Sequence, residues 1–362
     1  MKIYNKENSK KEKIFFNEIF EDNTRFCKKI NQIEYLNEGE IPIIDQGKSE
    51  IAGYSNLKEN IYNDIPAIIF GDHTRSIKYI DFPFLIAADG VKVLKNKRED
   101  FLDKYLYYAL KYFKIPNTGY NRHFKWLKEF SIYSLKIEEQ NKIVRVLDNI
   151  QEIIKIKKEQ LLQLNELSKS IFIKLKLKNK NWDIKSFAEV TKVSQGLQIP
   201  ISKRKKENGK NRFKYITIQF LNGSKEVEYI ENPRENVICS EEDILMTRTG
   251  NTGMVVTGVS GVFHNNFFIV RYDKNILLKE YLVAYLNSKE VQEEIKKRAG
   301  TSTIPDLNHG EFYKIKILIP PINFQEKFSK QIQVIAKSKV EIQKSIEETQ
   351  KLFDSLMEKY FG

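Results

Sequence analysis

Residues 138–178 read EEQNKIVRVLDNIQEIIKIKKEQLLQLNELSKSIFIKLKLK and contain neither glycine nor proline. Apolar side chains recur in this stretch at alternating steps of four and three residues, which is the spacing of a coiled-coil seam: Ile143, Leu147, Ile150, Ile154, Leu161, Leu164 and Ile171. Lys157 and Ser168 interrupt the row. At a rise of about 1.5 Å per residue, the pattern predicts a helix roughly 50 Å long, which is too long for the core of a small domain.

A second stretch, residues 323–362, repeats this spacing near the end of the chain. Its row is Phe328, Ile332, Ile335, Ile342, Ile346, Phe353, Leu356 and Tyr360, with interruptions at Lys339 and Thr349. Gln140 and Gln325 align the two stretches at an offset of 325 − 140 = 185 residues, and the two rows then coincide. The lysines of the two rows fall at different positions, so the helices can pair without a layer of two lysines. We call both rows together the seam.

The segments that precede the two helices also resemble each other. In the first half, a helical pattern at 103–113 follows strand-like runs at 41–44, 67–70 and 91–94. In the second half, a helical pattern at 279–298 follows strand-like runs at 215–218, 243–247, 254–257 and 267–272. Such echoes in the same order indicate a tandem duplication. The expected fold is α+β: two globular mixed α/β domains (14–137 and 179–322), joined by two long antiparallel coiled-coil helices (138–178 and 323–362) with pseudo-two-fold symmetry, after a solvated tail at 1–13.

The composition favours a polyanionic partner. The chain has 362 residues, a formal net charge of +13 and 41% hydrophobic residues, so it can bury sizeable cores and has a basic surface. No apolar run approaches the about 20 residues that a membrane helix requires, and the N-terminus has no signal-peptide core. Cys27 and Cys239 lack CxxC neighbours, so we expect neither disulfides nor a zinc site, and a cytoplasmic location.

Motifs for catalysis are missing from the sequence. No glycine-rich loop carries the Lys-Ser/Thr pair of a phosphate-binding loop, and Asn232-Pro233-Arg234 lacks the second proline of a methyltransferase active site. His73, His123, His264 and His309 lie far apart and without the spacing of metal ligands. We therefore expect no enzyme activity, no metal and no cofactor in this chain.

The chain resembles the specificity (S) subunit of type I restriction-modification systems over nearly its whole length. The residues that carry the resemblance are Trp182-Asp183 with Phe187 and Glu189-Val190, the segment Asp243-Ile244-Leu245 leading into Thr249-Gly250-Asn251-Thr252-Gly253, and Pro320-Pro321-Ile322 with Gln325. In the first half, Ile137-Glu138-Glu139-Gln140 corresponds to the last of these. The first half departs from the pattern, because it has no tryptophan at its start and His73-Thr74-Arg75 stands in place of the glycine-rich segment.

This resemblance implies two target recognition domains that read an asymmetric, bipartite site on double-stranded DNA. It also implies that the helices act as a spacer and bind two methyltransferase (M) subunits and, where present, restriction (R) subunits. S-adenosylmethionine, ATP and Mg²⁺ would bind to those partner subunits and not to this chain. The assembled complex would serve in host defence. Lengthening the central helix by one turn is then expected to change only the number of base pairs between the half-sites.

Loop residues able to bond bases or phosphates are the candidate DNA contacts. In the first domain they are Gln46, Lys48, His73, Thr74, Arg75, Lys78, Tyr120, Asn121, Arg122, His123 and Lys125. In the second they are Ser202, Lys203, Arg204, Lys205, Lys206, Lys210, Arg212, Thr247, Arg248, Thr249, Asn251, Thr301, Ser302, Thr303 and Asn308. The basic cluster at 202–206 favours phosphate contact, because its charges would otherwise repel one another.

Two other classes of function stay open at this point. One is a coiled-coil scaffold whose globular ends bind proteins, with the basic charge incidental. The other is an enzyme subunit with its own nuclease or methyltransferase activity, which the missing motifs disfavour. Binding to DNA through phosphates would differ from a protein-binding scaffold in its steep dependence on salt, and an activity assay on the isolated chain would reveal an enzyme.

Overall fold

Two compact units make up the protein: the first combines both ends of the chain, and the second is one continuous segment. A computed structural model describes residues 12–119, 121–177, 182–223, 226–300 and 305–362. Unit 1 comprises residues 1–157 and 345–362, and unit 2 comprises residues 158–344. Because the boundaries fall inside the two long helices, α4 passes from unit 1 into unit 2 and α10 returns from unit 2 to unit 1.

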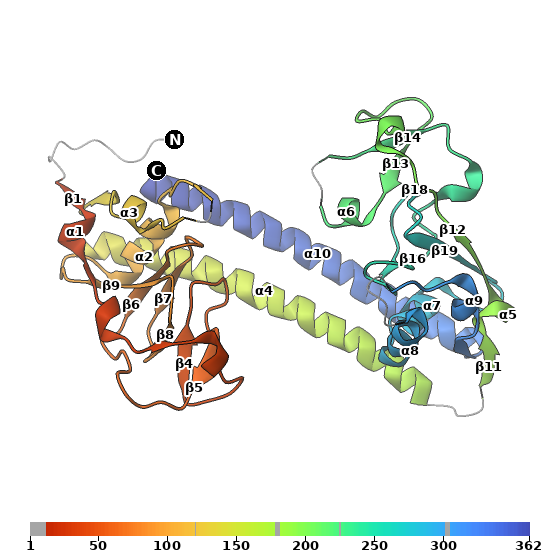
Figure 1. The fold of residues 1–362 in the computed structure, drawn as a ribbon, viewed down its shortest axis with the longest axis horizontal. Helices are drawn as coiled ribbons and strands as arrows, with labels where there is room; N and C mark the ends of the chain where they lie inside the picture. Colours follow the sequence, from red (N-terminus) through yellow and green to blue (C-terminus); the bar gives the residue numbers. More distant parts are fainter. Residues whose placement is uncertain (1–11, 120, 178–181, 224–225, 301–304) are drawn as a thin grey trace. The chain divides into compact units, whose positions relative to one another are not determined.

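Unit 1 contains two four-stranded sheets and a short two-stranded one (Figure 1). The first four-stranded sheet is antiparallel, in the order β2-β9-β6-β7, and the second, in the order β3-β8-β4-β5, pairs β8 in parallel with β3 and β4. The elements are β1 (Lys13–Phe15), α1 (Phe16–Ile19), β2 (Phe20–Asp22), η1 (Thr24–Phe26), β3 (Lys29–Ile30), η2 (Gln32–Glu34), β4 (Ile41–Ile44), β5 (Gly53–Ser55), β6 (Ala67–Gly71), β7 (Ile77–Ile80), β8 (Leu85–Ala87), β9 (Val91–Asn96), α2 (Asp103–Tyr112), α3 (Phe124–Leu127) and β10 (Ser131–Tyr133).

Unit 2 repeats this layout. Its antiparallel sheet has the order β12-β19-β16-β17, and its second sheet, β14-β13-β18-β15, again has a parallel pair at its centre, β13 with β18. The elements are β11 (Asp183–Ser186), α5 (Phe187–Val190), β12 (Thr191–Gln195), η3 (Ile201–Lys203), β13 (Arg212–Ile216), α6 (Ile218–Leu221), β14 (Tyr229–Glu231), η4 (Glu235–Val237), β15 (Ile238–Cys239), β16 (Leu245–Thr247), β17 (Val255–Val256), β18 (Gly261–Phe263), β19 (Phe267–Tyr272), α7 (Lys279–Leu286), α8 (Lys289–Ala299), α9 (His309–Tyr313) and β20 (Lys316–Ile319).

One sequence expectation is wrong within unit 2. The helical pattern at 279–298 forms two helices, α7 and α8, rather than one. Ser288 adopts an extended backbone (ψ 149°) at the N-cap of α8, after Asn287 has ended α7. Asn and Ser favour helix ends because their short polar side chains compete for backbone hydrogen bonds, and here that preference outweighs the continuous apolar pattern.

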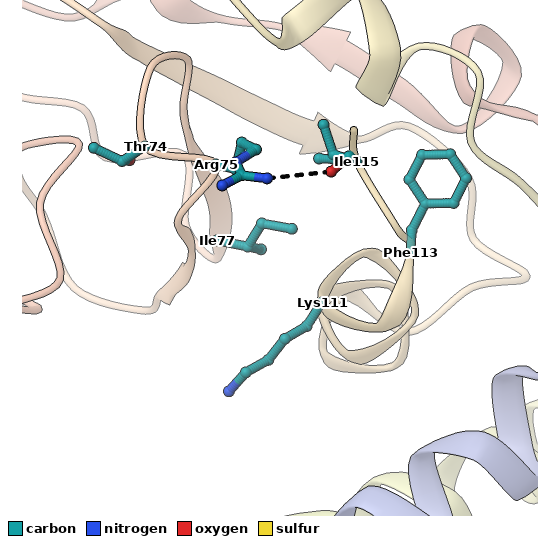
Figure 2. A pocket seen from close by; sticks show the side chains of 6 residues that line it. All are labelled: Thr74, Arg75, Ile77, Lys111, Phe113 and Ile115. Atoms are coloured by element: carbon teal, nitrogen blue, oxygen red, sulfur yellow. Dashed lines mark hydrogen bonds between the residues drawn. The ribbon is translucent and has the colours of Figure 1, made fainter. Parts of the chain in front are cut away.

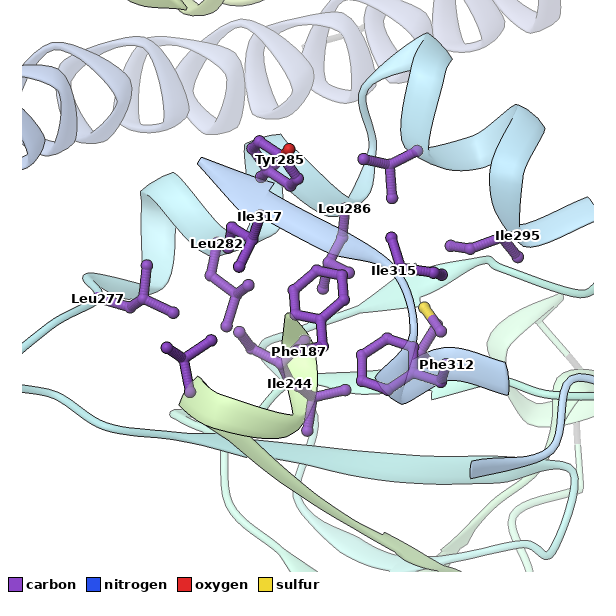
Figure 3. Close-up of a cluster of buried hydrophobic side chains, with 14 of the residues drawn as sticks. Phe187, Ile244, Leu277, Leu282, Tyr285, Leu286, Ile295, Phe312, Ile315 and Ile317 are labelled. Atoms are coloured by element: carbon purple, nitrogen blue, oxygen red, sulfur yellow. The ribbon is translucent and has the colours of Figure 1, made fainter. Parts of the chain in front are cut away.

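The main core of unit 2 forms where the sheet meets the helices (Figure 3). Phe187 stacks on Phe312 with ring centroids 4.7 Å apart and an interplanar angle of 9°. Leu282, Leu286 and Ile317 are fully buried in the same cluster. Phe172 of α4 and Phe328 of α10 belong to it too, so the two long helices form part of the wall of this core.

The long helices are α4 (Ile137–Leu177) and α10 (Ile322–Phe361), and they pair antiparallel within each unit. In unit 1, the first half of α4 meets the end of α10: Tyr108 of α2 donates a 2.6 Å hydrogen bond to Asp148 and packs its ring 6.2 Å from that of Phe353. In unit 2, the end of α4 meets the start of α10, since the rings of Phe172 and Phe328 are 5.9 Å apart. The expected α+β fold with two antiparallel long helices is confirmed.

Every residue of the predicted seam is buried or partly buried. The polar interruptions also face inward: Lys157 donates a hydrogen bond to Ser345 Oγ, and burial lowers the pKa of Lys339. The pattern missed Val144, Phe172 and Met357, which are buried one position after seam residues. The buried stripe is therefore wider than a two-position seam, because the helices also contact the globular parts of each unit.

A buried glutamine fixes the start of each long helix to the globular part of its unit. Gln140 Oε1 accepts from Leu102 N (2.9 Å), and its Nε2 donates to the carbonyl oxygens of Asp100 and Leu135 (2.8 Å each). Gln325 repeats all three bonds, with Leu278 N (2.9 Å) and the carbonyl oxygens of Ile276 and Pro320 (2.8 Å each). Both side chains are wholly buried, so the two residues that aligned the sequence repeats have the same structural role.

Candidate nucleic-acid interface

The loop between β6 and β7 is held against the segment that follows β4 in unit 1. Ser76 Oγ donates to the carbonyl oxygen of Gln46 (2.7 Å), Thr74 Oγ1 donates to the same oxygen, and His73 N donates to Gln46 Oε1 (3.2 Å). Lys78 Nζ lies 2.8 Å from Asp45 O and 3.2 Å from Asp45 Oδ1. The structure thus brings together four of the predicted DNA contacts, namely Gln46, His73, Thr74 and Lys78.

Lys78 is largely committed to that network. Its side chain is 8% exposed, and burial lowers its pKa while the Asp45 carboxylate opposes that shift. Lys48, two residues after Gln46, is exposed instead. Of these two lysines, only Lys48 remains in the proposed interface.

His123 is removed from the proposed interface because it is wholly buried. Its Nδ1 lies 3.0 Å from the carbonyl oxygen of Asp72 and its Nε2 lies 3.3 Å from Thr118 Oγ1. Asp72 in turn accepts a hydrogen bond from Phe124 N (2.7 Å) at the start of α3. His123 therefore ties the β6–β7 loop to α3, and a residue in that position cannot reach DNA.

The polar residues around His123 are placed differently. Asn121, Arg122 and Lys125 are exposed, and the Lys125 ammonium lies 5.0 Å from the Trp126 ring centroid. Tyr120 lies outside the described residues. The exposed set adjoins the β6–β7 loop through the His123–Asp72 contact, so both segments present cations on the same part of unit 1.

Arg75 lines a cavity of about 410 Å³ in unit 1 (Figure 2). Its backbone is left-handed (φ 62°), which is uncommon outside glycine, and its Nη1 donates to the carbonyl oxygen of Ile115 (3.4 Å). Lys111 of α2 stands opposite, and the remaining wall consists of Thr74, Ile77, Phe113 and Ile115. Sequence reasoning missed Lys111, because it lies in the predicted helix at 103–113 and only loop residues were considered as DNA contacts.

Unit 2 carries an exposed lysine cluster on and before β13. Lys203, Lys205, Lys206 and Lys210 are exposed, as are Ser202 and Lys214, the second of which the sequence did not single out. No carboxylate within the described part of the chain forms an ion pair with these lysines. We call Lys203, Lys205, Lys206, Lys210 and Lys214 the lysine patch.

The two arginines of this region serve the fold instead. Arg204 bonds Glu228 (Nη1 to Oε2, 2.8 Å) and the carbonyl oxygen of Ile199, and its guanidinium lies 5.0 Å from the Tyr215 ring centroid. Arg212 Nε lies 3.1 Å from Glu231 Oε1. The sequence placed all these cations in one cluster, whereas the structure separates paired arginines from unpaired lysines.

The loop between β16 and β17 has a buried base and an exposed tip. Thr247 is wholly buried, and its Oγ1 both donates to Asn251 O and accepts from Met254 N (2.9 Å), so Thr247 is also removed from the interface. Thr249 is partly buried, and Asn251 at the tip is exposed. Gly250 and Gly253 have φ values of 80° and 90°, which only glycine adopts without strain and which allow the turn to be this tight.

Arg248 in this loop is bound to Asp306, on the segment that precedes α9. Its Nε lies 2.9 Å from Asp306 Oδ1 and its Nη2 lies 2.5 Å from Oδ2. Asn308 caps α9 by accepting from Glu311 N (2.9 Å). Thr301, Ser302 and Thr303 lie outside the described residues.

The geometry offers no support for metal or thiol chemistry. Among the residues that the structure describes, no three His, Cys, Asp or Glu side chains are grouped to hold a metal ion. Burial raises the pKa of the Cys27 thiol to about 12 and that of Cys239 to about 11, so both stay protonated at neutral pH. Across the described ranges, no helix has the length and apolar character needed to cross a membrane.

The fold and the candidate site therefore define a class of protein with two similar α/β units, each with cationic loops and each containing part of both long helices. The sequence model of the type I restriction modification DNA specificity domain matches residues 8–166 and 179–351, so the chain belongs to that family. The two matches also confirm the tandem duplication.

Curated relatives include two specificity subunits. The chain is 28% identical over 142 residues to the type I restriction enzyme EcoR124I/EcoR124II specificity subunit of Escherichia coli, a match that covers 36% of this chain and 35% of the relative. It is 22% identical over 182 residues to the MjaVIII specificity subunit of Methanocaldococcus jannaschii, with 50% and 42% covered. The matched segments thus span less than half of either relative.

Solved structures share the fold over more of the chain. The S subunit of a type I restriction-modification system from M. genitalium aligns over 100% of this chain and 98% of its own, with a TM-score of 0.64 and 16% identity. A chain from a structure describing complex assembly and conformational transition of the type I R-M system aligns over 94% and 97%, with a TM-score of 0.52 and 15% identity.

Proposed function

We propose that this chain is the DNA sequence-recognition subunit of a type I restriction-modification complex. Each unit binds one half of an asymmetric, bipartite site on double-stranded DNA. The observation that carries the proposal is the duplication: the two units share one layout of sheets, each presents cationic loops, and the side chains of those loops differ between the units. Because base preference depends on side-chain type and placement, two different clusters suit two different half-sites.

The lysine patch supplies the phosphate-binding part of this interface in unit 2. Exposed, unpaired ammonium groups bind phosphate mainly through charge and release counterions when they do so. Arg122, Lys125 and Lys48 have the corresponding role in unit 1. Such contacts position the protein on the duplex and carry no base preference by themselves.

The long helices bind the partner subunits in this proposal. Both expose large apolar side chains away from the seam, including Leu162 (65% exposed) and Leu167 (46%) on α4 and Val334 (66%) and Val340 (69%) on α10. Large apolar side chains exposed to solvent are a feature of interaction surfaces. We assign these surfaces to two methyltransferase subunits and, where present, to restriction subunits.

The chain itself contributes no catalytic group. S-adenosylmethionine, ATP and Mg²⁺ bind the partner subunits, and the chain works in the cytoplasm, where the DNA is. Its contribution to the reaction is to choose the site, because only a complex held at the right sequence places the methyltransferase on its target.

Mapping of methylated bases across the genome, in cells with and without the gene for this chain, tests the proposal. A split motif that depends on the chain is the expected result. Failure to find any chain-dependent motif, together with DNA binding that does not weaken between low and moderate salt, would instead identify a protein-binding scaffold.

A further inference from the structure

The contact between Arg248 and Asp306 uses only one edge of the guanidinium group. Arginine has an edge formed by Nε and Nη2 and a second edge formed by Nη1 and Nη2, and each can bond a planar acceptor pair. Asp306 occupies the first edge, with distances of 2.9 Å and 2.5 Å. Within the described residues, no hydrogen bond occupies Arg248 Nη1, so the second edge keeps its donors.

The backbone on both sides of this pair is fixed. Leu307 N donates to the carbonyl oxygen of Arg248 (2.9 Å), and Thr249 and Asp306 form a β-bridge. Thr252 Oγ1 lies 3.1 Å from the carbonyl oxygens of both Arg248 and Pro305. The guanidinium is consequently held in place before any ligand arrives, which lowers the entropy cost of using it.

The pair lies at the surface, where a ligand can reach it. The Asp306 side chain is 44% exposed and that of Arg248 is 18% exposed, while Asn251 at the tip of the same loop is exposed. An ion pair with an exposed carboxylate contributes only modestly to stability by itself.

We propose that Arg248 reads one guanine of the half-site bound by unit 2, and that Asp306 is the residue that positions it. The outer Nη1–Nη2 edge donates to guanine O6 and N7 in the major groove, which is the bidentate contact that distinguishes guanine from the other bases. The Asp306 carboxylate fixes the guanidinium plane and receives no contact from the base. This inference rests on the proposed function and names the specificity residue within it.

Unit 1 has a parallel arrangement in the equivalent loop. Arg75 lies between β6 and β7, which occupy the same sheet positions as β16 and β17. Its guanidinium is tethered by Nη1 to Ile115 O, on the segment that leads to α3, as Asp306 lies on the segment that leads to α9. In each unit, the same loop thus supplies one arginine that is held from the side.

The test combines genome-wide methylation mapping with thermal melting of the purified full-length chain. Cells carrying the complete system would express the wild-type chain, Arg248→Ala, Asp306→Ala or Asp306→Asn. A matched control is Arg298→Ala, which breaks the ion pairs of Arg298 with Glu294 and Glu311 in the same unit without touching this loop.

Arg248→Ala is expected to lose about 10- to 100-fold of the preference for guanine at one position, while the other positions of the motif remain unchanged. Asp306→Ala relaxes the same position by a smaller factor, and Asp306→Asn, which can still accept from Nε, relaxes it least. Arg298→Ala keeps the whole motif. The melting temperatures show whether each variant is folded. If Arg248→Ala is folded, its methylated motif decides whether Arg248 reads a base.

Two results would overturn the inference. A folded Arg248→Ala chain with an unchanged motif would make the ion pair purely structural, and an unchanged motif for Asp306→Ala alone would remove Asp306 from its positioning role. Absence of any motif with the wild-type chain is a different outcome, because it overturns the proposed function before a variant is compared.

Discussion

Replacement of the buried glutamines that fix the long helices tests the packing argument most directly. Gln325→Ala removes three hydrogen bonds of 2.8–2.9 Å and leaves Leu278 N and the carbonyl oxygens of Ile276 and Pro320 without the partner they had. At about 1 kcal/mol for each hydrogen bond, with more where a buried group stays unpaired, the expected loss in free energy of unfolding is about 3 kcal/mol. Gln140→Ala is expected to lose a similar amount in unit 1.

An isosteric change separates hydrogen bonding from packing. Gln325→Glu keeps the shape and the acceptor for Leu278 N, but it directs a carboxylate oxygen at two carbonyl oxygens. The pKa of the introduced carboxyl must rise in the folded state, because burial and the facing oxygens disfavour its charge. Stability is then highest at pH values below the unfolded pKa of about 4.3 and falls as pH rises through the raised folded pKa.

Urea unfolding followed by circular dichroism measures these losses. The matched control is Gln160→Ala on the exposed face of α4, which should stay within about 0.5 kcal/mol of the wild type. The double variant Gln140→Ala/Gln325→Ala should show the sum of the two losses, since the residues lie in different units. Losses no larger than that of the control would refute the reasoning.

The contribution of the lysine patch to DNA affinity should depend on salt concentration. Changing all five of its lysines to alanine is expected to reduce the slope of log affinity against log salt by about 0.9 for each phosphate that the protein no longer neutralises. The methylated motif should stay the same. An unchanged slope in fluorescence anisotropy titrations would remove the patch from the DNA interface. Leu147 is wholly buried in the seam, so Leu147→Ala should lower the free energy of unfolding in urea by about 2–5 kcal/mol. Leu162 is exposed outside the seam, so Leu162→Ala should leave this free energy unchanged and instead weaken pull-down of the methyltransferase subunit. Equal stability losses for both would contradict the observed seam. Burial lowers the folded-state pKa of Lys339, so the charged side chain destabilises the folded protein at neutral pH. Lys339→Leu should therefore raise the free energy of unfolding at neutral pH. This gain over the wild type should shrink as pH rises toward the pKa of lysine in the unfolded chain. A pH-independent difference in unfolding free energy would show that Lys339 carries no such penalty.

The repeat, the helices and the family are properties of the sequence itself. A seam with a period of 3.5 residues, free of glycine and proline, predicts a helix from sequence, because spacing alone decides which side chains share a face. Gln140 and Gln325 could be matched from sequence for a related reason: each side chain supplies one acceptor and two donors to three backbone groups at the same place in its repeat.

Only the tertiary structure decided which polar loop residues are available to DNA. The buried His123 is next to the exposed Arg122 in sequence, and the buried Thr247 lies in the same short loop as the exposed Asn251. Sequence position therefore offered no means to separate the buried from the exposed residues. Arg204 and its lysine neighbours look alike in sequence, yet Glu228, the residue before β14, pairs with the arginine alone. The partner of Arg248 is 58 residues away along the chain. Charge, burial and orientation at these sites depend on contacts between distant segments, and no local pattern encodes them.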